Sequence, residues 1–112
     1  MEPIKINYLE FGALNLPQLK DFYTQTFGWS FTDYGPEYTE FDDGTMKGGL
    51  TTQTKPQAGG ALVVLKHDDL ESIKDRVLAN GGTITVDIFE FPGGRRFHFL
   101  DPDGNELAVW SD

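Results

Sequence analysis

The sequence predicts an α+β fold, in which two βαβββ modules form a curved mixed sheet with the helices on its outer face. Residues 95–110 alternate apolar and polar side chains on both sides of a turn, as a half-exposed hairpin does. The order strand, helix and three strands occurs twice. A constant offset of 54 relates Leu16 to Leu70 and Leu19 to Ile73. We therefore expect one domain over residues 1–112, with modules at approximately 1–54 and 60–112.

The first module begins with a predicted strand over residues 4–12. Asn15 is a good N-cap, and Pro17 suits a first helical turn, so a helix follows that ends near Gly28. Gly48 and Gly49 predict either a bulge or a close approach of other groups to the backbone. The remaining strands of this module are expected at 29–34, 37–41 and 46–54.

The second module follows a predicted linker at residues 55–60. Either Asp68 or Asp69 caps its helix, whose apolar residues recur at helical spacing and which ends at a glycine pair, Gly81 and Gly82. Residues 101–104, DPDG, form the tight turn of the final hairpin. The other predicted elements are strands at 61–66 and 83–89 and a turn at 92–94.

Composition excludes several classes of function. The 112 residues contain no cysteine, so there is no disulfide, thiolate metal site or cysteine nucleophile. A net charge of −9 disfavours a nucleic-acid partner. No apolar run is long enough to span a bilayer, and the first residues lack the pattern of a signal peptide. We expect a cytoplasmic protein that binds neither nucleic acid nor membrane.

Three motifs resemble those of the vicinal oxygen chelate superfamily, which includes glyoxalases, bleomycin-resistance proteins and extradiol dioxygenases. They are residues 16–29 with the helix sequence FYTQTFGW at their end, residues 79–83 (ANGGT) and residues 101–105 (DPDGN). The C-terminal part resembles small glyoxalase-like bacterial proteins. This resemblance implies paired βαβββ modules, a small-molecule ligand in the concavity of the sheet, and a homodimer.

The resemblance also implies where a metal would bind. The family's enzymes hold a divalent metal through His and Glu side chains on the strands. The corresponding positions here are Tyr8, a residue within 44–54, Leu62 and Ala108. None of these offers a usual ligand, whereas a divalent metal needs several converging oxygen or nitrogen donors. We expect no cofactor, and a divalent metal only through a displaced site.

Alternation along the strands separates core residues from candidate site residues. If Leu9, Phe97 and Val109 pack under the helices, residues of the opposite parity face the concavity. The ligand-binding candidates on that side are Tyr8, Leu62, Arg96, Ala108 and Trp110. The candidates for acid/base chemistry are Glu10, His98 and Glu106.

Each candidate also has a structural interpretation. His98 can act as a base or hydrogen-bond donor, or can simply bond a neighbouring carboxylate. Glu10 and Glu106 can form an acid/base pair, or can pair with Arg95 or Arg96 at the rim of the sheet. Arg96 can hold an anion through its bidentate fork or be a structural partner. Tyr8 and Trp110 can stack on a flat ligand or form core or dimer contacts.

Two classes of function remain open at this point. The first is metal-free binding of a small hydrophobic or aromatic molecule. The second is a lyase or isomerase resembling glyoxalase, with a displaced metal or with acid/base work by Glu10, His98 and Glu106. A purely structural partner protein is a third possibility. The loss of the family's usual ligands favours the first class.

Overall fold

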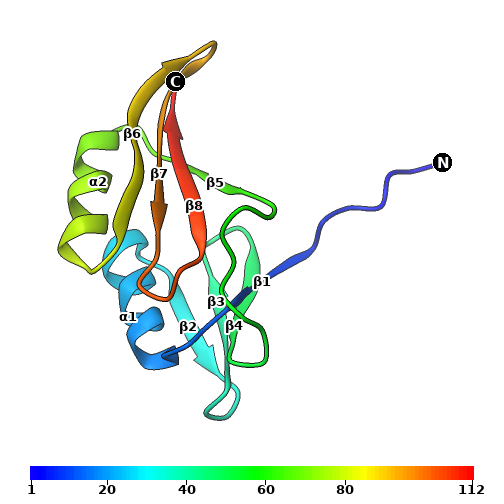
Figure 1. The fold of residues 1–112 in the computed structure, drawn as a ribbon. Coiled ribbons are helices and arrows are strands. Elements are labelled where there is room, and N and C mark those ends of the chain that lie inside the picture. The colour runs from blue at the N-terminus through cyan, green and yellow to red at the C-terminus, as the bar shows by residue number, and fades with distance from the viewer.

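The computed structural model describes residues 1–112 and contains two βαβββ modules (Figure 1). The first consists of β1 (Tyr8–Gly12), α1 (Leu16–Phe27), β2 (Ser30–Asp33), β3 (Tyr38–Asp42) and β4 (Lys47–Thr51). The second consists of β5 (Val63–Lys66), α2 (Leu70–Ala79), β6 (Thr83–Phe91), β7 (Gly94–Leu100) and β8 (Glu106–Ser111). The predicted fold class and the predicted order of elements are confirmed.

Several strand boundaries differ from the prediction; β4, for example, ends at Thr51 rather than at residue 54, and β5 starts at Val63 rather than at residue 61. β1 starts at Tyr8 rather than at residue 4, because its only partner, β4, pairs with Tyr8–Gly12 alone. Residues 1–7 extend away from the body of the molecule (Figure 1). β6 continues to Phe91, which pairs with Gly94, so the turn between β6 and β7 is shorter than expected.

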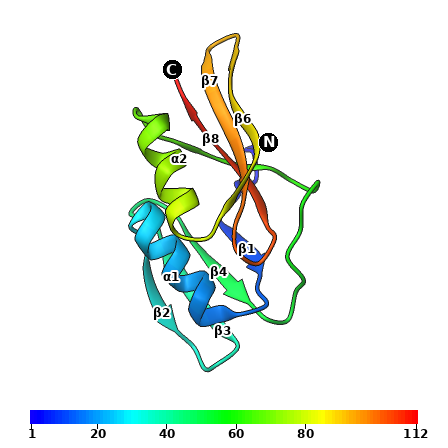
Figure 2. The same cartoon turned by 60° about the vertical axis from the view of Figure 1, so that its left-hand side comes forward.

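The curved arrangement consists of two hydrogen-bonded sheets of four strands. Their orders are β1-β4-β3-β2 and β5-β8-β7-β6, with β1 parallel to β4 and β5 parallel to β8. The edge strands β1 and β5 each have one sheet neighbour. Helices α1 and α2 pack against each other and lie on the same side of the molecule (Figure 2). Neither helix has the length and apolar character required to cross a membrane.

The helix ends follow the predicted capping. The Asn15 side chain accepts a hydrogen bond from the Gln18 amide at 3.1 Å. Of the two candidate caps of α2, Asp69 fills the position and accepts from the Ser72 amide at 3.1 Å. Gly28 ends α1 with φ 74°, a left-handed conformation that glycine adopts without steric cost.

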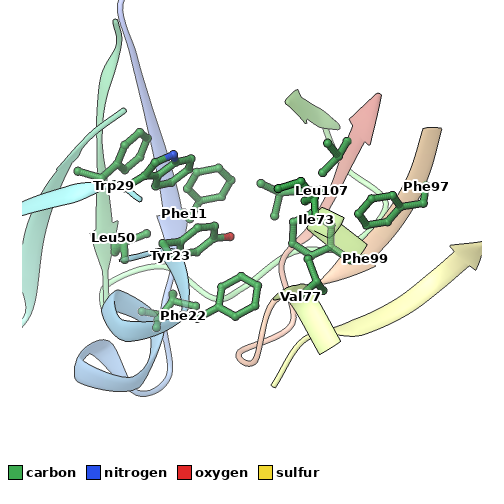
Figure 3. Packing of buried hydrophobic residues seen from close by; sticks show 14 of the residues in the cluster. Phe11, Phe22, Tyr23, Trp29, Leu50, Ile73, Val77, Phe97, Phe99 and Leu107 are labelled. Atoms are coloured by element: carbon green, nitrogen blue, oxygen red, sulfur yellow. The ribbon is translucent and has the colours of Figure 1, made fainter. Parts of the chain in front are cut away.

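An aromatic core joins the helices to the sheets (Figure 3). The Tyr23 ring stacks on Trp29 with their centroids 4.7 Å apart, and Trp29 stacks on Phe41 at 4.4 Å. The ring centre of Phe99 in the second module lies 5.7 Å from that of Phe27 in the first. Trp29 is only 6% exposed. The two modules therefore share one apolar cluster.

The glycine pair in β4 allows close approach on both faces of the sheet. A Cβ atom added at Gly48 would collide with the Leu9 carbonyl and the Phe41 ring. A Cβ added at Gly49 would collide with the Tyr38 hydroxyl on the opposite face. Of the two predicted explanations, close approach is the one observed.

The 101–105 turn fastens the second module to the first. Asp103 Oδ2 accepts hydrogen bonds from the amides of residues 14–15, at the start of α1, at 2.7 and 2.9 Å. The Asn105 side chain donates to the Gly12 carbonyl at 2.8 Å. Asp101 Oδ1 accepts from three amides of its own turn. This motif is therefore an inter-module contact as well as a turn.

Candidate functional site

The face of each sheet that is turned away from the helices, called the open face below, carries the predicted candidates. The assumption about parity is confirmed, because Phe97 and Val109 are buried in the core and Leu9 packs against it. Residues of the opposite parity therefore point to the other side. Val64 and Val86 on the open face of the second module are 43% and 41% exposed. This face is uncovered.

Strand register assembles a group of aromatic and basic side chains on the open face of the second module. Arg96 pairs with Trp110 on one side and with Phe89 on the other. The Arg96 guanidinium lies 5.5 Å from the ring centres of both Phe89 and Phe91. His98 follows on the same face of β7, with its ring 6.0 Å from Phe89. These five residues are called the aromatic platform below.

Two polar atoms of the platform lack protein partners. Arg96 Nε and His98 Nε2 are both buried and form no hydrogen bond. Arg96 forms no ion pair, whereas its neighbour Arg95 pairs with Glu71 at 2.7 Å. Arg96 therefore has no carboxylate partner in the structure and contacts the rings of Phe89 and Phe91 instead. Buried polar groups are normally paired, so these two atoms are exceptions on this face of the sheet.

Of the two aliphatic candidates, Ala108 lies within the sheet and Leu62 lies outside it. Ala108 is fully buried in the middle of the sheet, where it pairs with Val64 and His98. Its small side chain lies beside His98, its pairing partner on β7. Leu62 is half-buried and lies just before β5, although the predicted strand over 61–66 included it, because pairing with β8 begins only at Val63.

The open face of the first module carries a cluster of two tyrosines and two glutamates. The hydroxyls of Tyr8 and Tyr38 lie 2.7 Å apart. Tyr38 donates a hydrogen bond to Glu10 at 2.8 Å, and Tyr8 donates to Glu40 at 3.1 Å. Burial raises the pKa of Tyr8. The pKa of Tyr38 is raised more strongly, mainly by burial and also by its hydrogen bonds with Tyr8 and Glu10.

Sequence reasoning missed Tyr38 and Glu40. They share a face with Glu10 because β3, β4 and β1 are adjacent, with Glu40 and Glu10 both paired to Gly49. The signal available in the sequence was Gly49, which leaves room above β4 for a large side chain. Without the strand order, however, nothing identified the residue that fills that room.

The predicted catalytic trio is divided between two places. Glu10 and Glu106 line the same small cavity, of about 190 Å³, where β1 approaches the start of β8. His98 does not line this cavity and belongs to the aromatic platform. Neither glutamate pairs with Arg95, which is held by Glu71. Glu10 and Glu106 therefore border one cavity, whereas His98 lies apart from both.

The positions of the family's metal ligands can be located directly. The Tyr8 hydroxyl is engaged by Tyr38 and Glu40, and Gly49 is the β4 residue that pairs with Glu10 on the open face. Ala108 and Leu62 carry hydrocarbon side chains. No three His, Cys, Asp or Glu side chains lie close enough together to hold a metal ion.

Comparison with known proteins places this geometry in context. The model of the Glyoxalase/Bleomycin resistance protein/Dioxygenase superfamily matches residues 5–109. CFP32 of Mycobacterium tuberculosis and of Mycobacterium bovis, which are provisionally named glyoxylases, are each 25% identical to the chain over 118 aligned residues. These alignments cover 93% of this chain and 44% of CFP32. The chain thus spans less than half the length of these relatives.

Solved structures show the same fold at low sequence identity. A glyoxalase-related enzyme from Fulvimarina pelagi superimposes with a TM-score of 0.81 at 19% identity, covering 96% of this chain and 88% of that one. Fosfomycin resistance protein FosX from Mesorhizobium loti superimposes with a TM-score of 0.81 at 14% identity, covering 99% of this chain and 94% of that one. Lactoylglutathione lyase from Agrobacterium tumefaciens superimposes with a TM-score of 0.74 at 19% identity, covering 99% of this chain and 96% of that one.

Proposed function

The chain belongs to the Glyoxalase/Bleomycin resistance protein/Dioxygenase superfamily, and from this premise we propose that it binds a small aromatic molecule bearing an acidic group on the aromatic platform. The observation that carries the proposal is Arg96. Its guanidinium lies over Phe89 and Phe91, has no carboxylate partner, and has a buried Nε without a hydrogen bond. A carboxylate matches the planar guanidinium fork.

The surroundings of Arg96 favour an aromatic body over an aliphatic one. Trp110 pairs with Arg96 in the sheet and offers a ring to a flat ligand. His98 Nε2 supplies a second polar contact from the same strand. An apolar surface with a few convergent polar groups is typical of sites for small molecules.

We propose that binding requires no metal. Of the three single positions where relatives would supply ligands, only Tyr8 has a donor atom, and that oxygen already contacts Tyr38 and Glu40; the fourth, within residues 44–54, has no His, Asp or Glu to draw on. Hydrocarbon side chains at Leu62 and Ala108 supply no donor atoms. These residues do not fit a divalent metal, so no step of the proposed function depends on one.

A homodimer is part of the proposal. The open face of the first module carries Glu10 and Glu40, whereas that of the second carries Arg96. Opposite charges on the two faces favour a symmetric pairing in which each first module covers the partner's second module. Analytical ultracentrifugation at low and high salt tests this, because a monomer at both salt concentrations would contradict it.

Calorimetric titration with 1-naphthoate tests the ligand assignment, with 1-naphthalenemethanol as the uncharged analogue. We expect naphthoate to bind at least tenfold more tightly than the alcohol. Arg96→Gln should remove this preference, and Arg96→Lys should restore little of it because the bidentate fork is lost. Arg95→Gln removes the same charge one residue away and should leave affinity unchanged. Equal binding of naphthoate to wild type and Arg96→Gln would refute the proposal.

An acid/base lyase or isomerase is the second candidate, supported by the shared cavity of Glu10 and Glu106. The hemithioacetal of methylglyoxal and glutathione is a suitable probe, since one neighbour in structure is named a lactoylglutathione lyase. If this candidate is correct, Glu106→Gln should abolish turnover. His98→Ala should reduce turnover only if the platform holds the substrate. Turnover that survives both substitutions would exclude this assignment.

A further inference from the structure

A large cavity lies on the helix-covered side of the molecule, where the two modules meet. Its volume is about 490 Å³, within the range of ligand sites in proteins. Phe11 and Trp29 of the first module lie on one side and Ile73 of α2 on the other (Figure 3). It is called the junction cavity below. None of the five residues of the aromatic platform lines it, although Val64 borders both sites.

The junction cavity exists because the two sheets do not join. β1 and β5 are edge strands of separate sheets, so no hydrogen-bonded ladder draws them together. Leu9 on β1 and Leu65 on β5 remain half-buried, although both pack against the core and line the cavity. Protein interiors are normally close-packed, so an apolar space of this size is available for an apolar molecule.

One fully buried polar group lines this space, whose other polar lining residues are Asp43, Lys66, His67 and Arg76. Thr26 on α1 is completely buried, and its hydroxyl has no hydrogen-bond partner. Threonine within a helix commonly bonds a carbonyl of the preceding turn, but this hydroxyl does not. An unpaired buried hydroxyl is unfavourable unless something in the cavity bonds it.

The mouth of the cavity has an unpaired positive charge. Arg76 on α2 lines the cavity, is exposed, and forms no ion pair. The acidic residue that also lines the mouth, Asp43, uses Oδ1 to accept hydrogen bonds from the amides of Thr45 and Met46. In a chain of net charge −9, a free arginine at an apolar opening favours an anionic head group.

We propose that the junction cavity binds an amphipathic carboxylate, with its apolar body between the modules, its carboxylate at Arg76, and a polar contact to the Thr26 hydroxyl. This site is independent of the aromatic platform and of the function proposed for it. The ligand class follows from three features in one space, namely an apolar lining, a buried unpaired hydroxyl and a free guanidinium at the opening.

Titration of the 112-residue protein with decanoate and with decan-1-ol tests the proposal by calorimetry. In a Trp110→Phe background, Trp29 is the only tryptophan left and reports binding from within the cavity. We expect decanoate to bind at least fivefold more tightly than decanol and to change Trp29 fluorescence. Arg76→Gln should abolish this preference. Lys5→Gln, which removes a charge from the exposed N-terminal segment, should not.

Two further variants test the location. Leu65→Phe adds bulk inside the cavity and should weaken both ligands at least tenfold, whereas Val86→Phe adds bulk on the open face and should not affect either. Thr26→Val removes the unpaired hydroxyl, so it should raise the melting temperature while weakening decanoate. Absence of decanoate binding, or binding that Leu65→Phe leaves unchanged in a folded variant, would overturn the proposal. Binding lost in Arg96→Gln but kept in Arg76→Gln would assign the ligand to the platform instead and would also overturn it.

Discussion

The Tyr23 hydroxyl, on α1 of the first module, donates a hydrogen bond of 2.8 Å to the Asp101 carboxylate at the turn of the second module. Both residues are buried, and the Asn105 side chain donates to the same carboxylate oxygen at 2.8 Å. Burial raises the pKa of Asp101, and burial together with the nearby Asp101 charge raises that of Tyr23. The turn motif therefore contributes to the contact between the modules.

Tyr23→Phe should destabilise the protein by about 1.5–3 kcal/mol, because a hydrogen bond to a buried carboxylate is lost while the ring stacking on Trp29 remains. Denaturant unfolding at neutral pH measures the change. Tyr34→Phe removes a hydroxyl from a tyrosine that is 62% exposed and should change stability by less than about 0.5 kcal/mol. Equal effects of the two substitutions would show that the Asp101 bond contributes little.

The contact between Asp103 and α1 can be tested separately. Asp103→Ala removes the acceptor of the amides of residues 14–15 and should cost about 0.5–2 kcal/mol, as loss of a helix cap does. Asp75→Ala, at an exposed position on α2, is a matched loss of charge and should be nearly neutral. If the two variants unfold at the same denaturant concentration, the contact with α1 is not stabilising.

Alanine substitutions at Gly48 and Gly49 should destabilise the protein for different reasons. Gly48→Ala places a Cβ against the Leu9 carbonyl and the buried Phe41, so it should cost about 1–3 kcal/mol. Gly49→Ala meets only the end of the Tyr38 side chain, which can move outward at a cost of about 1 kcal/mol for its lost hydrogen bonds. A double-mutant cycle with Tyr38→Ala should show coupling for Gly49 and none for Gly48.

Alkaline pH should reveal the tyrosine–glutamate cluster. Because the folded-state pKa values of Tyr8 and Tyr38 lie above the unfolded value of about 10, both phenols are protonated in both states below that pH. Above it, the unfolded chain releases protons that the folded chain retains. Stability should therefore fall as the pH rises above about 10. The Tyr8→Phe/Tyr38→Phe double variant should lose less stability over this range in urea unfolding, and an equally steep loss would contradict the assignment.

Local chemistry explains how much of the fold was predictable. Asn15, Gly28 and Asp69 act through bonds or backbone angles that involve only neighbouring residues, so the capping residues and helix ends can be recognised in the sequence. Alternation fixes which residues share a face of one strand, and this prediction was confirmed for Phe97 and Val109. The strand limits were less accurate because they depend on the length of the partner strand.

For the candidate site, the sequence predicted which residues of each strand share a face, but not which residues of different strands lie together. Alternation placed Arg96, His98 and Trp110 on one face, but their unpaired atoms and the rings of Phe89 and Phe91 beside Arg96 depend on the pairing of β6 with β7. The ligand-binding and acid/base roles of the candidate residues remain predictions. The junction cavity was not foreseen, because it depends on how two separate sheets approach each other.

The sequence by itself determined the repeated module, the helix caps, the face on which each strand residue lies, and the absence of usual metal ligands at the family's positions. These features depend on local conformation or on residue type alone. Only the tertiary structure decided that Tyr38 reaches Glu10 across Gly49, that Tyr23 bonds Asp101, and that Glu10 and Glu106, but not His98, line one cavity. Such contacts join residues far apart in the chain, and strand order and module packing, which no local pattern encodes, bring them together.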